Sequence, residues 1–217
     1  VMLSSEWILI LDFGGQYTQL ITRAVRRAGV YSEILPFNSN PDELSSKPKG
    51  IILSGGPESV YTDQAPQPSS RWLELGIPIL GICYGMQWLN HHHGGSMLHG
   101  ANHSGEYGEI EINISNDQSL FDGIDKEIIS WMSHGDSIDQ NGLAENFKII
   151  GNSKKHVAAI FNQEKNLYGV QFHPEVSHMT DGQQILVNFL RIICKCKANW
   201  GMQDFLRQSH DYVRETV

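Results

Sequence analysis

Hydrophobic residues form short continuous runs in the first part of the chain, and each run is followed by a turn or a helical segment. The first run, WILILDF at Trp7–Phe13, stops at the turn Gly14-Gly15 and predicts a parallel strand buried on both faces. Similar patterns predict further strands over Tyr31–Phe37, Gly50–Leu53 and Ile77–Ile82. Helical spacing predicts helices over Gln16–Ala28 and Pro66–Leu75, and one that begins at Met86.

This alternation predicts an α/β fold with a doubly wound, mostly parallel central sheet of the flavodoxin-like type, which places function at the carboxyl ends of the strands. From Ser96 onward the pattern changes. Gly108–Ile114 alternates polar and apolar residues, as do short runs between Ile128 and Phe172, which predicts additional antiparallel strands. Turns are expected at Asn141-Gly142 and Asn162–Asn166, and an amphipathic closing helix over Asp181–Cys194.

The pattern divides the chain into a domain over residues 7–197 and a helical junction over residues 198–217. In the junction, Trp200–Val217 has a weak apolar stripe among charged residues. Two interpretations stay open: a surface helix, or the opening of a further domain.

Composition narrows the class of protein. The 217 residues are 40% hydrophobic and 18% charged, which suits a globular domain with a real core, and the net charge of −8 argues against a nucleic-acid binder. No apolar stretch is long enough to cross a bilayer, and the first residues lack a signal-peptide pattern. The odd count of three cysteines indicates a reducing compartment, so we expect a cytoplasmic protein that binds neither membranes nor nucleic acid.

Cys83 stands between the fourth predicted strand and the next helix, within Gly81-Ile82-Cys83-Tyr84-Gly85. This is the cysteine counterpart of the nucleophile elbow, a sharp strand-to-helix turn in which bulkier residues than glycine would collide. The N-terminus of the following helix favours a thiolate there. The alternative is an inert cysteine buried in a strand.

A nucleophilic cysteine needs a base and a group that orients the base. His173 and Glu175 are two residues apart in an extended segment, so their side chains share a face. A carboxylate beside an imidazole sets its tautomer and stabilises the imidazolium. The alternative is a polar strand end that merely meets solvent.

Several motifs together resemble the class I (triad-type) glutamine amidotransferases over roughly Ile8–Trp200. They are Asp12-Phe13-Gly14-Gly15-Gln16-Tyr17, Ser54-Gly55-Gly56-Pro57-Glu58-Ser59-Val60-Tyr61, Cys83-Tyr84-Gly85-Met86-Gln87, Ser133-His134-Gly135-Asp136-Ser137 and Gln171-Phe172-His173-Pro174-Glu175. The resemblance is closest to the branch of this family that feeds ammonia to a synthetase which aminates XMP to GMP. One departure is Ser104-Gly105-Glu106-Tyr107-Gly108, which lacks the arginine that usually precedes the glutamate.

The resemblance implies hydrolysis of L-glutamine to glutamate and ammonia by a catalytic triad of Cys83, His173 and Glu175. It places an oxyanion hole at the backbone N–H groups of Gly56 and Tyr84. It implies that the substrate is bound by Gln87, Ser133, His134, Gly135 and Asp136, with the carboxylate of Asp136 suited to the ammonium group of glutamine.

The resemblance also implies a partner, an ATP-pyrophosphatase domain that binds XMP. The loop Ser-Gly-Gly-Val-Asp-Ser that binds ATP in such domains does not occur in this sequence. ATP and Mg²⁺ are therefore expected only in that domain, and no cofactor is expected in this chain. Alternatives stay open: a glutaminase for another biosynthetic synthetase, a free-standing γ-glutamyl peptide hydrolase, or a non-catalytic binding module on the same fold.

No metal site is expected. Successive residues of a helix point about 100° apart, so His91-His92-His93 cannot share one ion. His99 and His103 lack a partner at ligand spacing, and Cys194-Lys195-Cys196 lacks a second cysteine pair.

Overall fold

The computed structural model describes residues 6–57, 59–98, 105–115, 118–138, 140–154 and 156–201. The strands are β1 (Trp7–Asp12), β2 (Tyr31–Pro36), β3 (Gly50–Leu53), β4 (Ile79–Ile82), β5 (Glu106–Ile114), β6 (Glu127–His134), β7 (Lys148–Asn152), β8 (Val157–Asn162) and β9 (Leu167–Val170). The α-helices are α1 (Thr18–Arg27), α2 (Arg71–Glu74), α3 (Tyr84–His92) and α4 (Gly182–Asn188).

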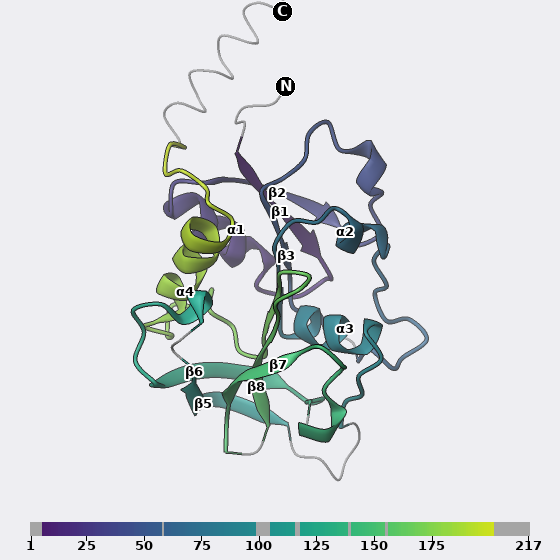
Figure 1. Cartoon of the computed structure of the whole chain (residues 1–217), viewed down its shortest axis with the longest axis vertical. Coiled ribbons are helices and arrows are strands. Elements are labelled where there is room, and N and C mark those ends of the chain that lie inside the picture. Colours follow the sequence, from purple (N-terminus) through teal and green to yellow (C-terminus); the bar gives the residue numbers. More distant parts are fainter. Residues whose placement is uncertain are drawn as a thin grey trace, which may run out of the picture.

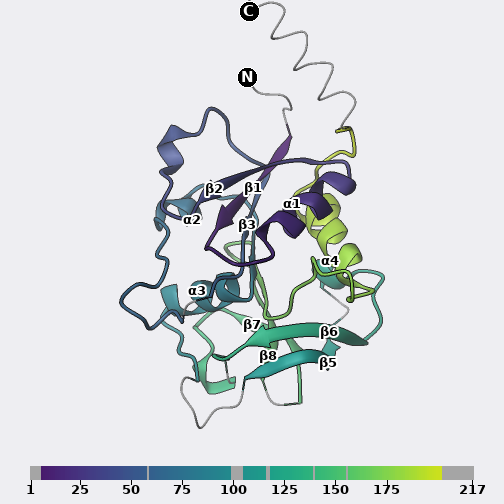
Figure 2. The ribbon, with the colours of Figure 1, turned by 180° about the vertical axis from the view of Figure 1, so that it is seen from behind.

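The described strands form one nine-stranded sheet in the order β2-β1-β3-β4-β9-β8-β7-β5-β6. The first five of these strands are parallel, which confirms the doubly wound core. Helices α1 and α4 cover one face of this part of the sheet, and α2 and α3 cover the other (Figure 1). The view from behind shows the same two layers of helices, with the β5–β6 pair at the far end of the sheet from β2 (Figure 2).

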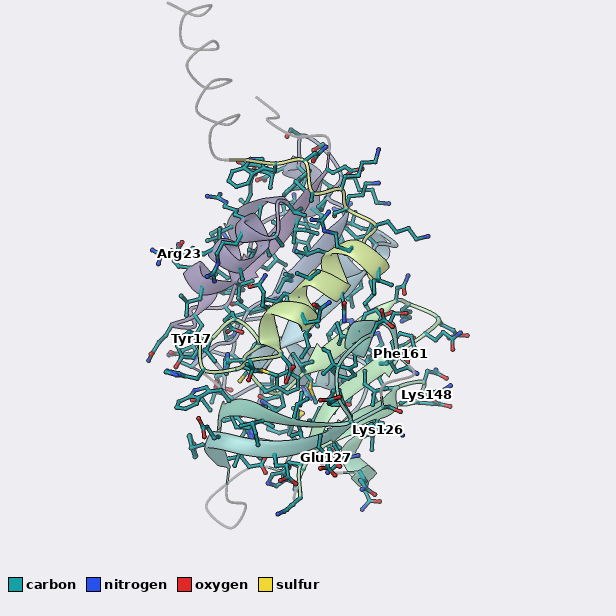
Figure 3. All side chains as sticks on the ribbon, turned by 90° about the vertical axis from the view of Figure 1, so that its left-hand side faces the viewer. Tyr17, Arg23, Lys126, Glu127, Lys148 and Phe161 are labelled. Carbon is teal, nitrogen blue, oxygen red and sulfur yellow. The ribbon has the colours of Figure 1, made fainter. Side chains whose placement is uncertain are left out.

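Alternate residues of the apolar strands enter separate cores, as the two-sided burial of a parallel strand requires. In β1, Ile8 and Ile10 pack in the core that contains Ile21 of α1 and Leu186 of α4. Leu9 and Leu11 belong to the other core, with residues of α2 and α3. The outer side of α1 carries Arg23 in solvent (Figure 3).

The second half of the sheet is antiparallel, as the alternating pattern predicts. Asn162–Asn166 lies in the turn that joins β8 to β9, because Asn162 pairs with Leu167 across it. Asn141-Gly142 is also a turn, but it lies in the 3₁₀ segment Gln140–Gly142 between β6 and β7, which are not neighbours in the sheet. It is therefore not a hairpin.

Two predicted helices have different bounds in the structure. The segment expected to be helical from Pro66 is helical only over Arg71–Glu74, because Pro66 and Pro68 restrict their preceding residues to extended conformations. The closing helix is α-helical over Gly182–Asn188 and continues as a π-helical turn over Phe189–Ile193.

The predicted junction falls on residues 198–217, of which 202–217 lie outside the described residues. Among the described helices, none combines the length and the hydropathy needed to span a bilayer.

Candidate active site

Cys83 occupies a sharp turn between β4 and α3. Its backbone has φ 52° and ψ −106°, a left-handed conformation that is uncommon outside glycine and typical of strained functional positions. The flanking glycines are required for space: a Cβ on Gly81 would lie 2.5 Å from the carbonyl carbon of Gly85, and one on Gly85 would lie 2.6 Å from the Leu53 carbonyl oxygen. Both contacts are with backbone, which cannot easily move, so the steric argument for an elbow is confirmed.

His173 and Glu175 form a buried pair directly after β9. The Nδ1–H of His173 donates to Oε1 of Glu175 at 2.8 Å, and the two side chains are 5% and 0% exposed. The Tyr17 ring packs edge-on against the imidazole, with 4.9 Å between ring centroids. Because Nδ1 is held by the carboxylate, Nε2 is the nitrogen left to exchange a proton with Cys83.

The protonated form of His173 is favoured by its surroundings. Burial lowers the pKa of His173, but its hydrogen bonds with Cys83 and Glu175 and their negative charges outweigh burial and raise the pKa to about 10. The imidazolium form of His173 is therefore favoured at neutral pH.

Two glycine loops meet beside Cys83. A Cβ added to Gly15, after β1, would lie 2.3 Å from the carbonyl oxygen of Gly55, after β3. A Cβ on Gly55 would in turn lie 3.1 Å from the His173 ring and 3.6 Å from Cβ of Cys83. Only glycines allow the two loops to approach each other and the cysteine this closely.

The two predicted oxyanion donors lie at this point. Gly56 packs against the Tyr84 ring, since a Cβ there would lie 3.4 Å from it. Tyr84 is the first residue of α3, so its backbone N–H is at the N-terminal end of the helix, the end that favours negative charge. The Tyr84 side chain is anchored away from the pocket, because its hydroxyl donates to the Pro66 carbonyl at 2.8 Å.

A pocket of about 420 Å³ opens over Cys83. Every predicted site residue lines it except Glu175, which lies behind His173. The structure thus brings together the cysteine elbow, the glycine loops and the segment Ser133–Asp136, which are distant in sequence.

Gln87 and His134 are in the pocket wall, but their side chains are engaged within the protein. Nε2 of Gln87 donates to the Asp136 carbonyl at 2.9 Å and to Oε1 of Gln171 at 3.1 Å. The His134 side chain is 1% exposed; its Nδ1–H donates to the same Asp136 carbonyl at 2.8 Å, and Nε2 lies 3.5 Å from Oε2 of Glu106. The ring of His134 therefore supports the loop, and a contact between His134 and the substrate stays a prediction.

Sequence reasoning missed several residues of the site. The Ser59 hydroxyl lines the pocket and donates to the carboxylate of Asp136, and the exposed Tyr107 ring stands at the pocket rim. No local pattern links these residues to Cys83. Gln171 could have been found, because the period of two that pairs His173 with Glu175 also includes position 171.

The histidines at the C-terminal end of α3 have structural contacts. His92 stacks on Trp88 with 5.0 Å between ring centroids, and Nε2 of His93 lies 3.2 Å from Nζ of Lys165. Within the described ranges, no cluster of three or more histidine, cysteine or acidic side chains could hold a metal. His99 and His103 lie outside the described residues. Cys194 and Cys196 are buried free thiols.

The sequence model of the family "Glutamine amidotransferase class-I" matches residues 9–193. GMP synthase [glutamine-hydrolyzing] of Brachyspira hyodysenteriae is 50% identical over 97% of the chain, and that of Acetivibrio thermocellus is 50% identical over 99%. The chain spans less than half the length of these relatives, 40% of the first and 42% of the second.

Solved structures agree with this relationship. The structure of a GMP synthase subunit from Thermoplasma acidophilum superposes with a TM-score of 0.74 at 30% identity, covering 88% of this chain and 94% of that one. A glutamine amidotransferase from Thermotoga maritima, with a TM-score of 0.68 at 16% identity over 89% of this chain and 100% of that one, supports the fold alone.

Proposed function

The chain belongs to the class-I glutamine amidotransferase family, and on this premise we propose that it hydrolyses L-glutamine to glutamate and ammonia with Cys83 as the nucleophile. The observation that carries the proposal is the pairing of a cysteine on a strained elbow, at φ 52°, with a buried His173–Glu175 pair in one pocket. A reactive thiol needs this arrangement, whereas a structural cysteine does not.

The reaction would begin with attack of the Cys83 thiolate on the side-chain amide carbon of glutamine. The carbon–sulfur bond forms, and the carbonyl electron pair moves to oxygen. Nε2 of His173 then gives its proton to the amide nitrogen, the carbon–nitrogen bond breaks, and ammonia leaves a glutamyl thioester. Neutral His173 next removes a proton from water, whose oxygen attacks the thioester and releases glutamate and the thiolate.

The two charges that develop have complementary groups in the pocket. The oxyanion would accept hydrogen bonds from the backbone N–H groups of Gly56 and Tyr84; such a donor typically contributes about 10²–10³-fold in rate. At the amino-acid end of the substrate, the Asp136 carboxylate suits the ammonium group, while Ser133 and Gly135 line the same wall. Ser59 holds the Asp136 carboxylate in place.

We further propose that the ammonia is used for the ATP-dependent amination of XMP to GMP by an XMP-binding synthetase partner of the ATP-pyrophosphatase type. The support is the similarity to curated relatives named GMP synthase [glutamine-hydrolyzing], of whose length this chain matches 40% and 42%. ATP and Mg²⁺ would belong to that partner, and the glutamine reaction in this chain proceeds without them.

Release of glutamate from glutamine, measured for the wild-type chain and for Cys83→Ala, tests the first proposal. Glutamate release that disappears in Cys83→Ala supports it, and equal rates in both proteins would exclude Cys83 as the nucleophile. The second proposal is tested by mixing the chain with the synthetase part of a relative, XMP, ATP and Mg²⁺. GMP formed from glutamine supports it, whereas GMP formed only from added ammonium would refute it.

A further inference from the structure

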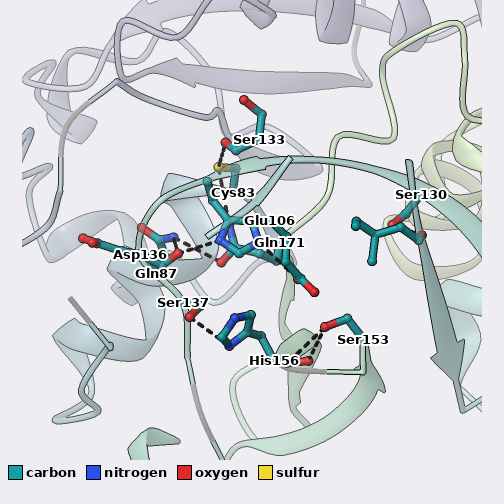
Figure 4. Close-up of polar contacts among 12 residues, drawn as sticks. Cys83, Gln87, Glu106, Ser130, Ser133, Asp136, Ser137, Ser153, His156 and Gln171 are labelled. Atoms are coloured by element: carbon teal, nitrogen blue, oxygen red, sulfur yellow. Dashed lines mark hydrogen bonds and ion pairs between the residues drawn. The ribbon is translucent and has the colours of Figure 1, made fainter. Parts of the chain in front are cut away.

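Gln171 lies fully buried between Cys83 and Gln87, at the centre of a chain of hydrogen bonds (Figure 4). Its Nε2 lies 3.5 Å from Sγ of Cys83, and its Oε1 accepts from Nε2 of Gln87 at 3.1 Å. Gln87 also donates to the Asp136 carbonyl at 2.9 Å. One continuous network therefore runs from the loop that faces the substrate pocket to the nucleophilic sulfur.

The direction of each bond in this network follows from the chemistry of the groups. A backbone carbonyl can only accept, so Gln87 must turn its NH₂ group toward Asp136. The second hydrogen of that NH₂ group then points to Gln171, which must accept it with its side-chain oxygen. The NH₂ group of Gln171 is thereby aimed at Cys83. The oxygen and nitrogen of both amides are thus assigned by the network and not by an arbitrary choice.

We propose that Gln171 is a further catalytic residue, one that donates an N–H···S hydrogen bond to the Cys83 thiolate, and that Gln87 is the positioning residue that keeps its amide in this orientation. The inference rests on the proposed function, because it assigns a role toward the same nucleophile. It also gives Gln87 a task besides contact with the substrate.

The groups around the sulfur of Cys83 interact differently with the thiol and with the thiolate. The Ser133 carbonyl oxygen lies 3.8 Å from Sγ and can accept only from the protonated thiol. A thiolate has no hydrogen to donate and gains from the Gln171 donor instead. Gln171 therefore favours the charged, reactive form. Since a neutral amide does not take a proton, it leaves proton exchange to His173.

The test measures the rate at which iodoacetamide alkylates Cys83 as a function of pH, resolved by peptide mass spectrometry on the full chain. The titratable side chains that share the pocket with Cys83, or lie directly behind it, are Tyr17, Tyr84, Tyr107, His134, Asp136, His173 and Glu175. They are left unchanged in all the variants, so a shift of the midpoint reports on the substituted residue.

Two substitutions separate the donor from the rest of the network. Gln171→Met removes the donor without adding charge, and Gln171→Glu keeps an acceptor for Gln87 while replacing the NH₂ group with oxygen. Both substitutions should move the midpoint of alkylation to higher pH. For Gln171→Met the expected shift is about one pH unit, so at a pH below the midpoint Cys83 should be alkylated about tenfold more slowly than in the wild type. Gln171→Glu should move it further, because its carboxylate repels the thiolate.

Gln19→Glu, on the exposed side of α1, is the matched control and should alkylate like the wild type. An unchanged midpoint in folded Gln171→Met would overturn the inference, even if Gln171→Glu shifts. That result differs from failure of the proposed function, in which the wild type itself would release no glutamate and its Cys83 would react no faster than a cysteine in an unfolded peptide.

Discussion

Glu175→Gln is the most informative single substitution, because it changes one buried atom and removes one charge. In the wild type, Oε1 of Glu175 accepts from Nδ1–H of His173 at 2.8 Å, while Oε2 is buried without a hydrogen-bond partner among the described residues. The glutamine amide therefore has two orientations. With its oxygen toward His173, its NH₂ group is left buried and unpaired, which costs about 1–3 kcal/mol.

With its NH₂ group toward His173, the amide requires an unprotonated Nδ1. The ring proton is then on Nε2, and neutral His173 cannot accept a proton from Cys83 or from water. A wrong tautomer of this kind lowers kcat by about 10⁴-fold in serine proteases. The cost of the unpaired NH₂ group lowers the population of the orientation that has its oxygen toward His173 by about 5- to 150-fold. We therefore expect kcat for glutamate release to fall by about 10²–10⁴-fold in Glu175→Gln.

The pH dependence gives a second readout. The Glu175 hydrogen bond and charge help to raise the pKa of His173 to about 10, so the substitution should lower that pKa and reduce alkylation of Cys83 at pH 7. Because the pKa of His173 is higher in the folded state than in the unfolded state, protonation of His173 stabilises the fold. This stabilisation is complete below the unfolded pKa of about 6.5 and is lost as the pH rises toward 10. The Tm difference between wild type and Glu175→Gln should shrink over that interval.

The assays are coupled measurement of glutamate release and thermal melts from pH 6 to 10. Glu145→Gln, at an exposed glutamate that does not line the pocket, provides the charge control and should behave like the wild type. A Glu175→Gln protein that is folded and keeps its kcat within about twofold of the wild type would refute the role of Glu175 as the group that orients His173.

Two further substitutions test the elbow and the substrate loop. Gly85→Ala places a Cβ 2.6 Å from the Leu53 carbonyl oxygen and should lower the free energy of unfolding by about 1–3 kcal/mol, measured as a lower Tm. In the control Gly135→Ala the Cβ would meet only the Tyr107 hydroxyl, at 3.5 Å, so this variant should melt like the wild type. Equal Tm values for both variants would contradict the steric argument. Ser59→Ala removes the donor to Asp136 and should raise KM for glutamine about tenfold with little change in kcat, while Ser69→Ala should change neither; a loss confined to kcat would argue against a role in substrate binding.

The parallel half of the fold was predictable because its signal is local. A buried parallel strand is apolar on both faces, so the run at Trp7–Phe13 identifies β1 almost to its last residue. The pattern was less reliable where backbone restrictions compete with helical spacing, as before Arg71. Strand order was not available from the pattern: β9 pairs with β4, although β5, β6, β7 and β8 all lie between these two strands in the chain.

The elbow and its base were also predictable, since each depends on neighbours a few residues away. Gly81 and Gly85 identify the turn at Cys83, and a spacing of two pairs His173 with Glu175. The residues that complete the pocket depend on contacts across the fold. Ser59, after β3, donates to Asp136, after β6, although these two strands are not neighbours in the sheet. Glu106 lies against His134 because β5 and β6 pair at these two residues.

The sequence by itself thus determined the reactive groups and the local geometry that each of them needs, because turns, strand periodicity and steric demand for glycine act over a few residues. The tertiary structure alone decided which of these groups meet and how they are held. It turned Gln87 and His134 inward as supports and aimed Gln171 at Cys83. Hydrogen-bond direction and burial are properties of the packed assembly, where each donor must find its acceptor among residues brought from distant parts of the chain.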